Sequence, residues 1–590
     1  MESKQPAAAR VEALRAWMRE NGVDAYIVPT ADPHNDEYVP ARWMCREWLT
    51  GFDGSAGLAV VTLSAAALWT DSRYWLQASD QLAGTPFRLM REGEQDVPSP
   101  RQWVEAELGA GAAVSCPPDM LTAAMAAEWG IDPAAALDAF DVVWDGRPAL
   151  PAAPVYPQPL RYAGLGVEEK LSLVAEWLDA RMESGQYLFN DLSDIAWLLN
   201  LRGGDIPYNP VFLAYLLYRR EGRHFTLYTH DETLTAEART QMISAGVEVR
   251  PYAEAEDACR AATTAFSPSA PVCVSRYGGE TLDSPAEPLR AVKCEAEREG
   301  FREAMARDGA AMVSFLRWLD GMTERGGEVT EMSADAKLTA LRAAQPGYEQ
   351  LSFATIAAYG AHGAVVHYEA TPATDARLGG KGFLLLDSGA QYDCGTTDIT
   401  RTITLGPLTE EERRVYTLVL KGHLALARQR FPVGTTGLQI DLAARQYMWQ
   451  EGYDFGHGTG HGVGSHLCVH EGPHQIRKNP RPCTLLPLAE GMTVTDEPGV
   501  YVPGRFGVRI ENTLLCVDGG ETPFGRFLRF ESLTLCPYDL RPVVGGMLTA
   551  EEVEQINSYH SLVLERLMPR LADRADRDWL AKATMPIETE

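Results

Sequence analysis

Hydrophobic positions in the first half of the chain alternate between helix-like and strand-like spacing. Val11 to Asn21 shows the three-to-four-residue spacing of an amphipathic helix, and the short apolar run Ala25 to Pro29 predicts a strand. Leu58 to Trp69 contains two further strand-like runs, and Thr70 to Tyr74 leads through a turn into a helix. Strands that alternate with helices predict an α/β layer structure.

A proline-rich segment interrupts this pattern. Five prolines lie between residues 147 and 160, which disfavours regular structure and predicts an extended linker. The segment that begins at Tyr187 then partly repeats the segment that begins at Tyr26. Each segment begins with a short strand and continues to a stretch that contains a tryptophan and ends in glycine. A second apolar strand then follows. We therefore expect two domains of related fold, over residues 1–155 and 156–290.

A long helical pattern opens the third part of the chain. From Ala291 to Leu319 the residues are first charged and then apolar at i, i+3 and i+4, and Leu548 to Leu571 shows a second helical pattern. A chain of 590 residues is too long for a single hydrophobic core. We assign residues 291–590 to a third domain.

The composition is that of an ordinary soluble protein. The formal net charge is -28, whereas nucleic acids and anionic membranes recruit proteins through basic patches. No apolar run is long enough to span a bilayer, and Met1 to Gly22 lacks the apolar centre of a secretory signal. The ten cysteines are scattered from Cys45 to Cys536 without a Cys-x-x-Cys pair, as expected for reduced thiols. We therefore expect a cytoplasmic enzyme with no nucleic-acid or membrane partner.

The candidate chemistry begins with a stretch rich in glycine and histidine, Phe455 to His470. Glycine occupies every second position from Gly458 to Gly464, and four such residues disfavour a helix by about 1 kcal/mol each. In an extended chain, one face would carry no side chains and would admit another backbone or a ligand, whereas the other would present His457 and His461 together. Taken alone, the stretch is equally compatible with a glycine-rich loop of solvated histidines.

Two pairs of carboxylates flank this stretch in the sequence. Asp387 ends one apolar run and Asp398 opens another, and the residues between them include the glycines and polar residues that a hairpin turn requires. The midpoint of the two aspartates falls between Tyr392 and Asp393. A symmetric hairpin would set the aspartates opposite each other, with Cβ atoms ~5 Å apart.

Glu497 and Glu511 show the same arrangement, with their midpoint at Gly504 in a Pro-Gly turn. Two acidic pairs and one histidine strand predict a cage of four carboxylates and an imidazole. Like charges this close would repel one another and raise their pKa values unless cations neutralise them. We therefore predict two divalent metal ions. The oxygen-rich ligand set favours Mn²⁺ and tolerates Co²⁺, Fe²⁺ or Zn²⁺.

The order of these motifs resembles that of the Xaa-Pro aminopeptidases (aminopeptidase P) of metallopeptidase family M24, particularly their three-domain cytoplasmic type. The resemblance runs through the motifs Gly51 to Gly57, Trp69 to Tyr74, Ala196 to Gly203, Asn209 to Phe212, Asp387 to Tyr392, Gly395 to Asp398, His457 to Gly462 and Asp496 to Gly499. It implies two creatinase-like N-terminal α/β domains, a C-terminal catalytic domain of the pita-bread fold, and a homodimer.

The resemblance assigns the metal ligands residue by residue. They would be Asp387, Asp398, His461, Glu497 and Glu511. Asp398 and Glu511 would bridge the two metals, Asp387 would bind one of them, and His461 with Glu497 would bind the other.

The same resemblance supplies the other site residues. The catalytic set would be Glu497, His367, His470 and His457, and the substrate-binding set Arg73, His367, His470 and Arg509. His367 follows two valines and is expected on a strand. Arg73 would reach the peptide beyond the proline, although an ion-paired surface arginine is an equal alternative. His362 and His474 have no counterpart in the family and are expected at the surface.

The implied activity is release of the N-terminal residue from peptides with proline in the second position. A hydroxide held between the metals would attack the carbonyl carbon of the first residue, with Glu497 as proton carrier and His367 or His470 at the oxyanion. Two alternatives stay open. One is a prolidase acting on Xaa-Pro dipeptides, which shares the ligand cage. The other is a non-catalytic binding protein on the same fold, which a loss of metal ligands would mark.

Overall fold

Residues 6–324 and 327–588 are described by a computed structural model, in which the chain divides into two units. Unit 1 is Met1–Ala286 and unit 2 is Glu287–Glu590. The mixed α/β class predicted from the sequence is confirmed. The expected domain limits at residues 155 and 290 stay predictions, since the division does not separate the first two domains.

The first sheet of unit 1 is built on a fully buried strand. From edge to edge it contains β4 (Arg88–Arg91), β3 (Ala66–Thr70), β2 (Leu58–Thr62), β1 (Ala25–Pro29) and β5 (Val114–Ser115). Every residue of β1 is buried, which explains why this strand reads as a continuous apolar run. Helix α1 (Ala7–Asn21) buries Val11, Leu14 and Met18, and it ends at Gly22 in the left-handed conformation, with φ 66°.

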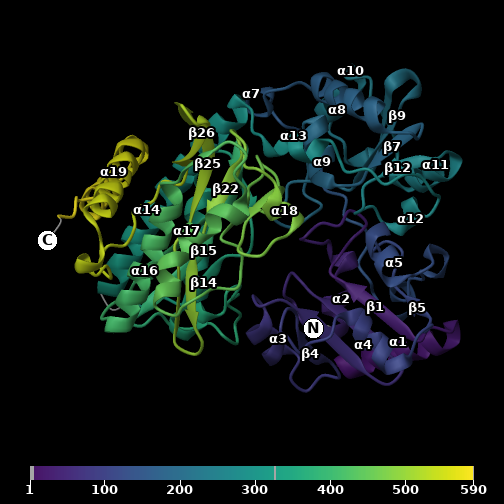
Figure 1. Ribbon diagram of the computed structural model, residues 1–590, viewed down its shortest axis with the longest axis horizontal. Coiled ribbons are helices and arrows are strands. Elements are labelled where there is room, and N and C mark those ends of the chain that lie inside the picture. The colour runs from purple at the N-terminus through teal and green to yellow at the C-terminus, as the bar shows by residue number, and fades with distance from the viewer. Residues whose placement is uncertain (1–5, 325–326, 589–590) are drawn as a thin grey trace. The chain divides into compact units, whose positions relative to one another are not determined.

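The second sheet of unit 1 repeats the first. Its order is β11 (Glu248–Pro251), β10 (His224–Thr229), β9 (Ala214–Arg219), β7 (Gln186–Phe189) and β12 (Thr264–Phe266). In both sheets the first strand along the chain pairs antiparallel with the second and parallel with the last. In both, the second and third strands are antiparallel and the third and fourth are parallel. Two domains of related fold are therefore confirmed (Figure 1, purple and blue).

Helices and a short linker complete unit 1. The helices are α2 (Cys45–Thr50), α3 (Trp75–Gln81), α4 (Pro100–Leu108), α5 (Ala123–Trp129), α6 (Phe140–Val143), α7 (Leu160–Ala163), α8 (Val167–Arg181), α9 (Leu192–Leu199), α10 (Ala236–Ser244), α11 (Ala255–Ala261), α12 (Val272–Ser275) and α13 (Ala286–Ala291), which crosses into unit 2. The proline-rich segment is largely irregular. Its short strand β6 (Tyr156–Pro157) pairs with β8 (Leu201–Arg202), and Val155 forms a β-bridge with Leu234.

Unit 2 combines long helices with several small sheets. Its helices are α14 (Glu295–Glu324), α15 (Glu331–Ala343), α16 (Glu410–Ala427), α17 (Gly437–Gln450), α18 (Pro482–Leu485), α19 (Ala550–Leu567) and α20 (Arg574–Ala583). Helix α14 begins later than predicted because Val292 forms a β-bridge with Met492. Helix α19 is shorter than predicted. It starts after the cap Thr549 and ends before Pro569, which lacks the N–H that a helix interior requires.

The sheets of unit 2 are antiparallel throughout. One contains β14 (Ile356–Tyr359), β15 (Phe383–Ser388) and β18 (Ile399–Thr404), and another contains β19 (Arg430–Pro432), β26 (Gly525–Ser532), β25 (Asn512–Thr522) and β22 (Thr493–Asp496). The smaller sheets are β13 (Tyr348–Leu351) with β16 (Ala390–Tyr392) and β17 (Gly395–Thr396), β20 (Gly460–Gly462) with β21 (Glu471–Ile476), and β23 (Gly499–Val502) with β24 (Phe506–Arg509). Helices α14, α16 and α17 run alongside these strands (Figure 1).

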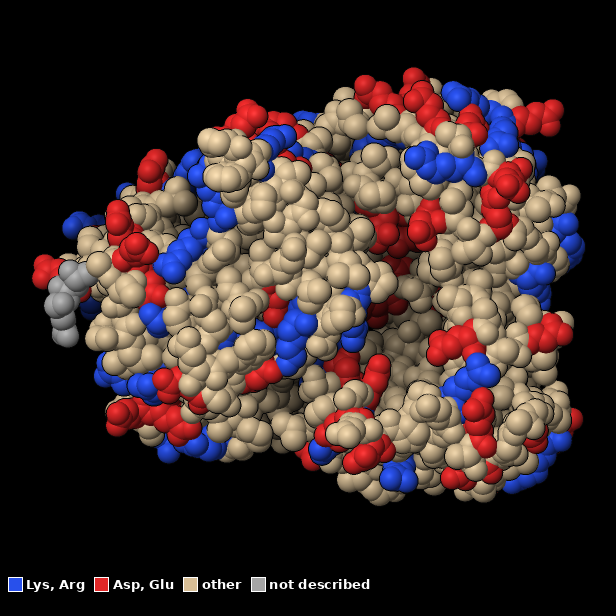
Figure 2. All heavy atoms as spheres, viewed as in Figure 1, with Lys and Arg blue, Asp and Glu red and all other residues tan. Residues whose placement is uncertain are grey.

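Charges on the surface are mixed in sign. On the face shown in Figure 2, acidic side chains are interspersed with basic ones, against a formal net charge of -28 for the chain. Among the described residues, no helix combines the length and the apolar character needed to cross a membrane.

A buried ion pair joins two helices of unit 2 to the end of strand β15. Asp308 on α14 accepts two hydrogen bonds of 2.9 Å from Arg342 on α15, and both side chains are buried. The Tyr392 hydroxyl also donates to Asp308 (3.2 Å), and Arg342 donates to the carbonyl oxygens of Ser388 and Gly389. The pair therefore fixes the backbone directly after Asp387.

Asp308→Ala should lower the free energy of unfolding by about 3–5 kcal/mol, because it leaves the buried charge of Arg342 without its partner. Urea denaturation followed by circular dichroism measures the change. The matched control is Asp578→Ala at the exposed pair with Arg574, where the loss should stay below about 1 kcal/mol. Equal losses for the two variants would contradict the prediction.

Candidate active site

The two aspartates lie at one end of the β15–β18 hairpin. Asp387 pairs with Thr400 across the ladder, and Asp398 directly precedes β18. The prediction that the two aspartates pair directly across the hairpin is therefore wrong, because the strand register differs from the predicted one by two residues. The hairpin turns at Asp393 and Cys394, because Tyr392 pairs with Gly395. Since strand side chains alternate with a period of two, a two-residue shift keeps both aspartates on one face as diagonal neighbours.

The two glutamates lie opposite each other, as predicted. Strands β22 and β25 pair Asp496 with Asn512, and strands β23 and β24 pair Gly499 with Arg509. The same register on both sides sets Glu497 across from Glu511, with the turn centred on Gly504. The ladder is interrupted at the two glutamates themselves.

One histidine joins the carboxylates. Asp398, His461 and Glu511 each offer a ligand atom, and these atoms all lie within 4.8 Å of one another. His461 Nε2 is 3.5 Å from Asp398 Oδ2 and 3.6 Å from Glu497 Oε1. Asp387 Oδ1 is buried and accepts no hydrogen bond among the described residues. A buried carboxylate oxygen without a hydrogen bond, close to this cluster, could be satisfied as a ligand of a cation.

Burial and mutual repulsion oppose ionisation of the carboxylates. Burial, followed by the charges of its acidic neighbours, raises the pKa of Asp398 well above its usual range, and the same causes raise the pKa of Glu511. Burial raises the pKa of Glu497 to about 7, even though Arg509 opposes the shift. The protein by itself therefore does not hold these carboxylates fully charged near neutral pH, whereas bound cations would.

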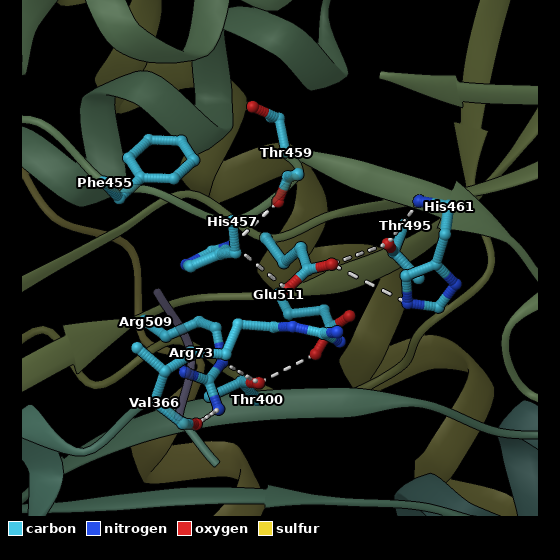
Figure 3. Close-up of polar contacts among 12 residues, drawn as sticks. Arg73, Val366, Thr400, Phe455, His457, Thr459, His461, Thr495, Arg509 and Glu511 are labelled. Atoms are coloured by element: carbon cyan, nitrogen blue, oxygen red, sulfur yellow. Dashed lines mark hydrogen bonds and ion pairs between the residues drawn. The ribbon is translucent and has the colours of Figure 1, made fainter. Parts of the chain in front are cut away.

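The glycine-rich stretch lets two backbones approach, as its pattern predicts. A Cβ atom at Gly460 would lie 1.8 Å from the carbonyl oxygen of Thr495. This contact brings β20 against β22, and the His461 N–H donates to Thr495 Oγ1 (3.1 Å). His461 is thereby placed beside Glu497, which follows β22 directly. Figure 3 shows His461 and Thr495 side by side.

His457 lies in the same pocket and is held by a tyrosine that the sequence analysis missed. Its Nδ1 donates to the carbonyl oxygen of Gly458 (2.7 Å), and Nδ1 is 3.7 Å from Glu497 Oε2. Burial, then the charge of Arg509, lowers the pKa of His457 well below its usual range. Nε2 of the neutral ring therefore accepts from the Tyr501 hydroxyl (2.8 Å). Tyr501 lies four residues after Glu497, a spacing that puts two side chains on one face of an extended chain.

The Arg509 guanidinium makes hydrogen bonds to several protein groups at the site. It is buried, and it donates to Asp387 Oδ2 through Nη2 (2.5 Å) and Nε (3.1 Å). It also donates to the Tyr501 hydroxyl (2.7 Å). A further hydrogen bond goes to Thr400 Oγ1 (3.2 Å), beside Arg509 in Figure 3. These contacts orient Asp387, whose Oδ1 accepts no hydrogen bond among the described residues. The role of Arg509 in substrate binding stays a prediction.

The two remaining histidines lie on irregular segments. The His470 ring packs edge-on against the His461 ring, with centroids 4.4 Å apart, at the start of β21. His367 lies in a turn after the short helix Gly360–Ala364, so its expected strand is wrong. Its neighbour Val366 accepts a hydrogen bond from Arg509 (3.5 Å), which brings the turn to the site.

Arg73 is ion-paired within unit 1. After strand β3, its Nε and Nη2 donate to the two carboxylate oxygens of Asp71 at 2.9 and 2.8 Å. The guanidinium also lies over the Tyr74 ring, 5.2 Å from its centroid. These contacts fit the ion-paired alternative for Arg73, and its role in substrate binding stays a prediction.

Two further histidines differ in their surroundings. His474, expected at the surface, is fully buried, and its Nε2 is 2.8 Å from the carbonyl oxygen of Thr493. Burial lowers the pKa of His474 to about 4. The ring fills the space beside Gly462, where a Cβ would lie 2.9 Å from it. His362 is half-buried and pairs with Glu331 (2.8 Å).

Sequence models of known families cover most of the chain. Residues 299–518 match metallopeptidase family M24, and residues 526–587 match the C-terminal region of peptidase M24. Residues 10–135 and 146–297 each match a creatinase/prolidase N-terminal domain.

Named relatives match over nearly the full length. The chain is 38% identical to a probable Xaa-Pro aminopeptidase P of Colletotrichum graminicola, over 98% of this chain and 99% of that one. It is 36% identical to aminopeptidase P1 of Lotus japonicus, with the same coverage. Among solved structures, it is similar to the X-prolyl aminopeptidase of Caenorhabditis elegans, described as a cytosolic enzyme with a di-nuclear active site. That match has 32% identity and a TM-score of 0.93, and it covers 99% of this chain and 100% of that one. The chain belongs to metallopeptidase family M24, among the Xaa-Pro aminopeptidases P.

Proposed function

We propose that this chain is a metalloaminopeptidase that releases the N-terminal residue from peptides with proline in the second position. The observation that carries the proposal is the convergence of Asp398, Glu511, Glu497 and His461 at one site of unit 2. Asp387 lies close enough to oppose the ionisation of Asp398. Relatives named Xaa-Pro aminopeptidase P support the same activity. A non-catalytic protein of this fold would have no need of such a site.

The site residues fit two divalent cations. Asp398 and Glu511 would hold both cations, Asp387 would hold one of them, and His461 with Glu497 would hold the other. The relative from C. elegans is described as di-nuclear. The four carboxylates with a single imidazole favour Mn²⁺, with Co²⁺ or Zn²⁺ as alternatives. When bound, the cations would supply a nucleophile at neutral pH and polarise the substrate carbonyl.

Glu497 is the carboxylate best placed to carry a proton. Its side chain is 18% exposed, compared with 11% for Asp387 and 5% for Asp398, so it is the most accessible to substrate. The leaving group is the nitrogen of proline, which has no N–H in the peptide. It must gain a proton as the bond breaks, and Glu497 supplies that proton.

We assign two histidines near the metal ligands to the oxyanion. His470 packs against the ligand His461, and His367 follows Val366, which contacts Arg509. A ring N–H from either histidine would donate to the carbonyl oxygen as its negative charge grows. Arg73 is assigned to the peptide beyond the proline on the family resemblance alone.

We also propose that the enzyme is cytoplasmic and forms a homodimer. The relative from C. elegans is described as cytosolic, and the homodimer follows the family resemblance. Cell fractionation and light scattering of the purified chain check these two statements, and a mass of one chain would exclude the dimer.

Removal of metal should abolish hydrolysis, and Mn²⁺ or Co²⁺ should restore it. The melting temperature should also fall, because bound metal stabilises only the folded state and its loss restores carboxylate repulsion. Metal analysis, peptide hydrolysis and calorimetry before and after chelation test this. Full activity in fully demetallated protein would exclude the metallopeptidase mechanism.

His461→Ala should lower the metal content, because it removes a ligand. His367→Ala and His470→Ala should keep the metal but turn over more slowly. Each should lose about 2–4 kcal/mol of transition-state stabilisation. Elemental analysis and kinetics of the three variants separate these roles, with His224→Ala at an exposed ion pair of unit 1 as control. Loss of metal from all three variants would make the histidines structural supports.

Substrate length distinguishes this activity from that of a prolidase. The enzyme should release arginine from Arg-Pro-Pro peptides and cleave Xaa-Pro dipeptides poorly. If Arg73 contacts the peptide beyond the proline, Arg73→Ala should lower kcat/KM more for long peptides than for tripeptides. Comparison of kcat/KM for dipeptides, tripeptides and longer peptides distinguishes the two activities. Equal or faster turnover of dipeptides by the wild type would identify a prolidase.

A further inference from the structure

The segment that carries His457 has no regular structure of its own. Residues 453–459 connect helix α17 to strand β20 and form no ladder with a neighbouring strand. Their backbone carbonyl groups therefore need partners from elsewhere in the protein. Arg445, on the preceding helix, points into this segment and is fully buried.

All five N–H groups of Arg445 have a partner, and four of the partners belong to the segment. Nε donates to Asp441 Oδ2 (2.7 Å) on the same helix. Nη1 donates to Asp454 Oδ1 (2.9 Å) and to the Phe455 carbonyl (2.8 Å). Nη2 donates to the carbonyl of His457 itself (3.1 Å) and to Thr459 Oγ1 (3.3 Å). One planar group thus fixes the backbone on both sides of the His457 side chain.

Contacts through the Phe455 ring give a second connection from Arg445 to the histidine. The Arg445 guanidinium lies over the Phe455 ring, 3.6 Å from its centroid, and the Phe455 ring centroid is 4.8 Å from that of His457. On its far side, the His457 ring contacts Tyr501 and approaches Glu497. Figure 3 shows Phe455 and His457 near each other in the site.

The acidic partner of Arg445 also serves the segment. Asp441 is buried, balances the charge of Arg445, and accepts a hydrogen bond from Thr459 (2.5 Å) through its other oxygen. A lysine could not replace this arrangement. An ammonium group offers three donors from one point, whereas the guanidinium offers five in a fixed plane.

We propose that Arg445 is a positioning residue for turnover, which sets the ring of His457 relative to Glu497 by holding residues 454–459. The inference rests on the proposed function for its kinetic readout. Arg445 itself touches neither the metal ligands nor the space between them in the contacts described above, so its effect on the reaction would pass through His457.

Arg445→Lys should lower kcat on an Arg-Pro-Pro peptide by about 10- to 100-fold, the loss expected when a site group is misplaced by about 1 Å. Metal content and KM should stay close to those of the wild type. The matched control is Arg414→Lys, at an exposed pair with Glu451 (2.6 Å), which should leave kcat unchanged. A normal kcat for Arg445→Lys would overturn the inference.

A double-mutant cycle tests whether the effect passes through His457. In a His457→Ala background, Arg445→Lys should change kcat by less than about twofold, because coupled residues do not act additively. If His457→Ala slows turnover and Arg445→Lys costs the same factor in both backgrounds, Arg445 acts through general stability and the inference fails.

Two further measurements cover the remaining outcomes. If Arg445→Lys does not fold, Thr459→Val takes its place in the cycle, since it removes one contact of Arg445 and one of Asp441. A wild-type chain with no activity on proline peptides would refute the proposed function, not the positioning role. A crystal structure of the variant then decides, and a His457 ring in its wild-type position would overturn the inference.

Discussion

Four carboxylates gathered at one site, three of them buried, are the constraint on which the rest of unit 2 depends. Burial alone raises the pKa values of Asp398, Glu497 and Glu511, and each charge opposes ionisation of its neighbours. The buried guanidinium of Arg509 pairs with Asp387. Such a cluster is stable as a fully charged set only with bound cations. The strand ends that bring the carboxylates together therefore build a site that needs metal.

The segments that carry His367, His457 and His470 are irregular, and each is held by a buried charged residue. Arg445 fixes the segment that carries His457. Glu331 accepts from the backbone N–H groups of Tyr359 and Ala376, at the two ends of the segment that carries His367. Next to His470, Glu471 pairs with Arg290 and Lys293, and all three side chains are buried. Fully paired buried groups of this kind lock a loop more firmly than apolar contacts alone, because their geometry is directional.

Unit 1 contains the same sheet topology twice. The two five-stranded sheets share strand order and strand direction. The sequence shows this repeat only weakly, in the runs that follow Tyr26 and Tyr187. A sheet requires buried apolar strands and suitable turns rather than particular residues, so a topology can persist while sequences diverge.

The sequence by itself determined the elements and the candidate ligands. Strand β1 matches its predicted range to the residue, and the turn centred on Gly504 has the predicted register. Both are local properties, because apolar periodicity and the spacing about a turn lie within one stretch of chain. The convergence of Asp398, His461 and Glu511 also followed from hairpins of this kind together with the family resemblance.

Only the tertiary structure decided how these pieces meet. The β15–β18 hairpin shifted by two residues because β16 and β17 turn at Asp393 and Cys394 while packed in a sheet with β13. The burial of His474, the contact of Tyr501 with His457, and the five partners of Arg445 depend on segments that approach one another in space. Hydrogen bonds between distant residues leave no local pattern, because the partner of a side chain is set by packing and not by its neighbours along the chain.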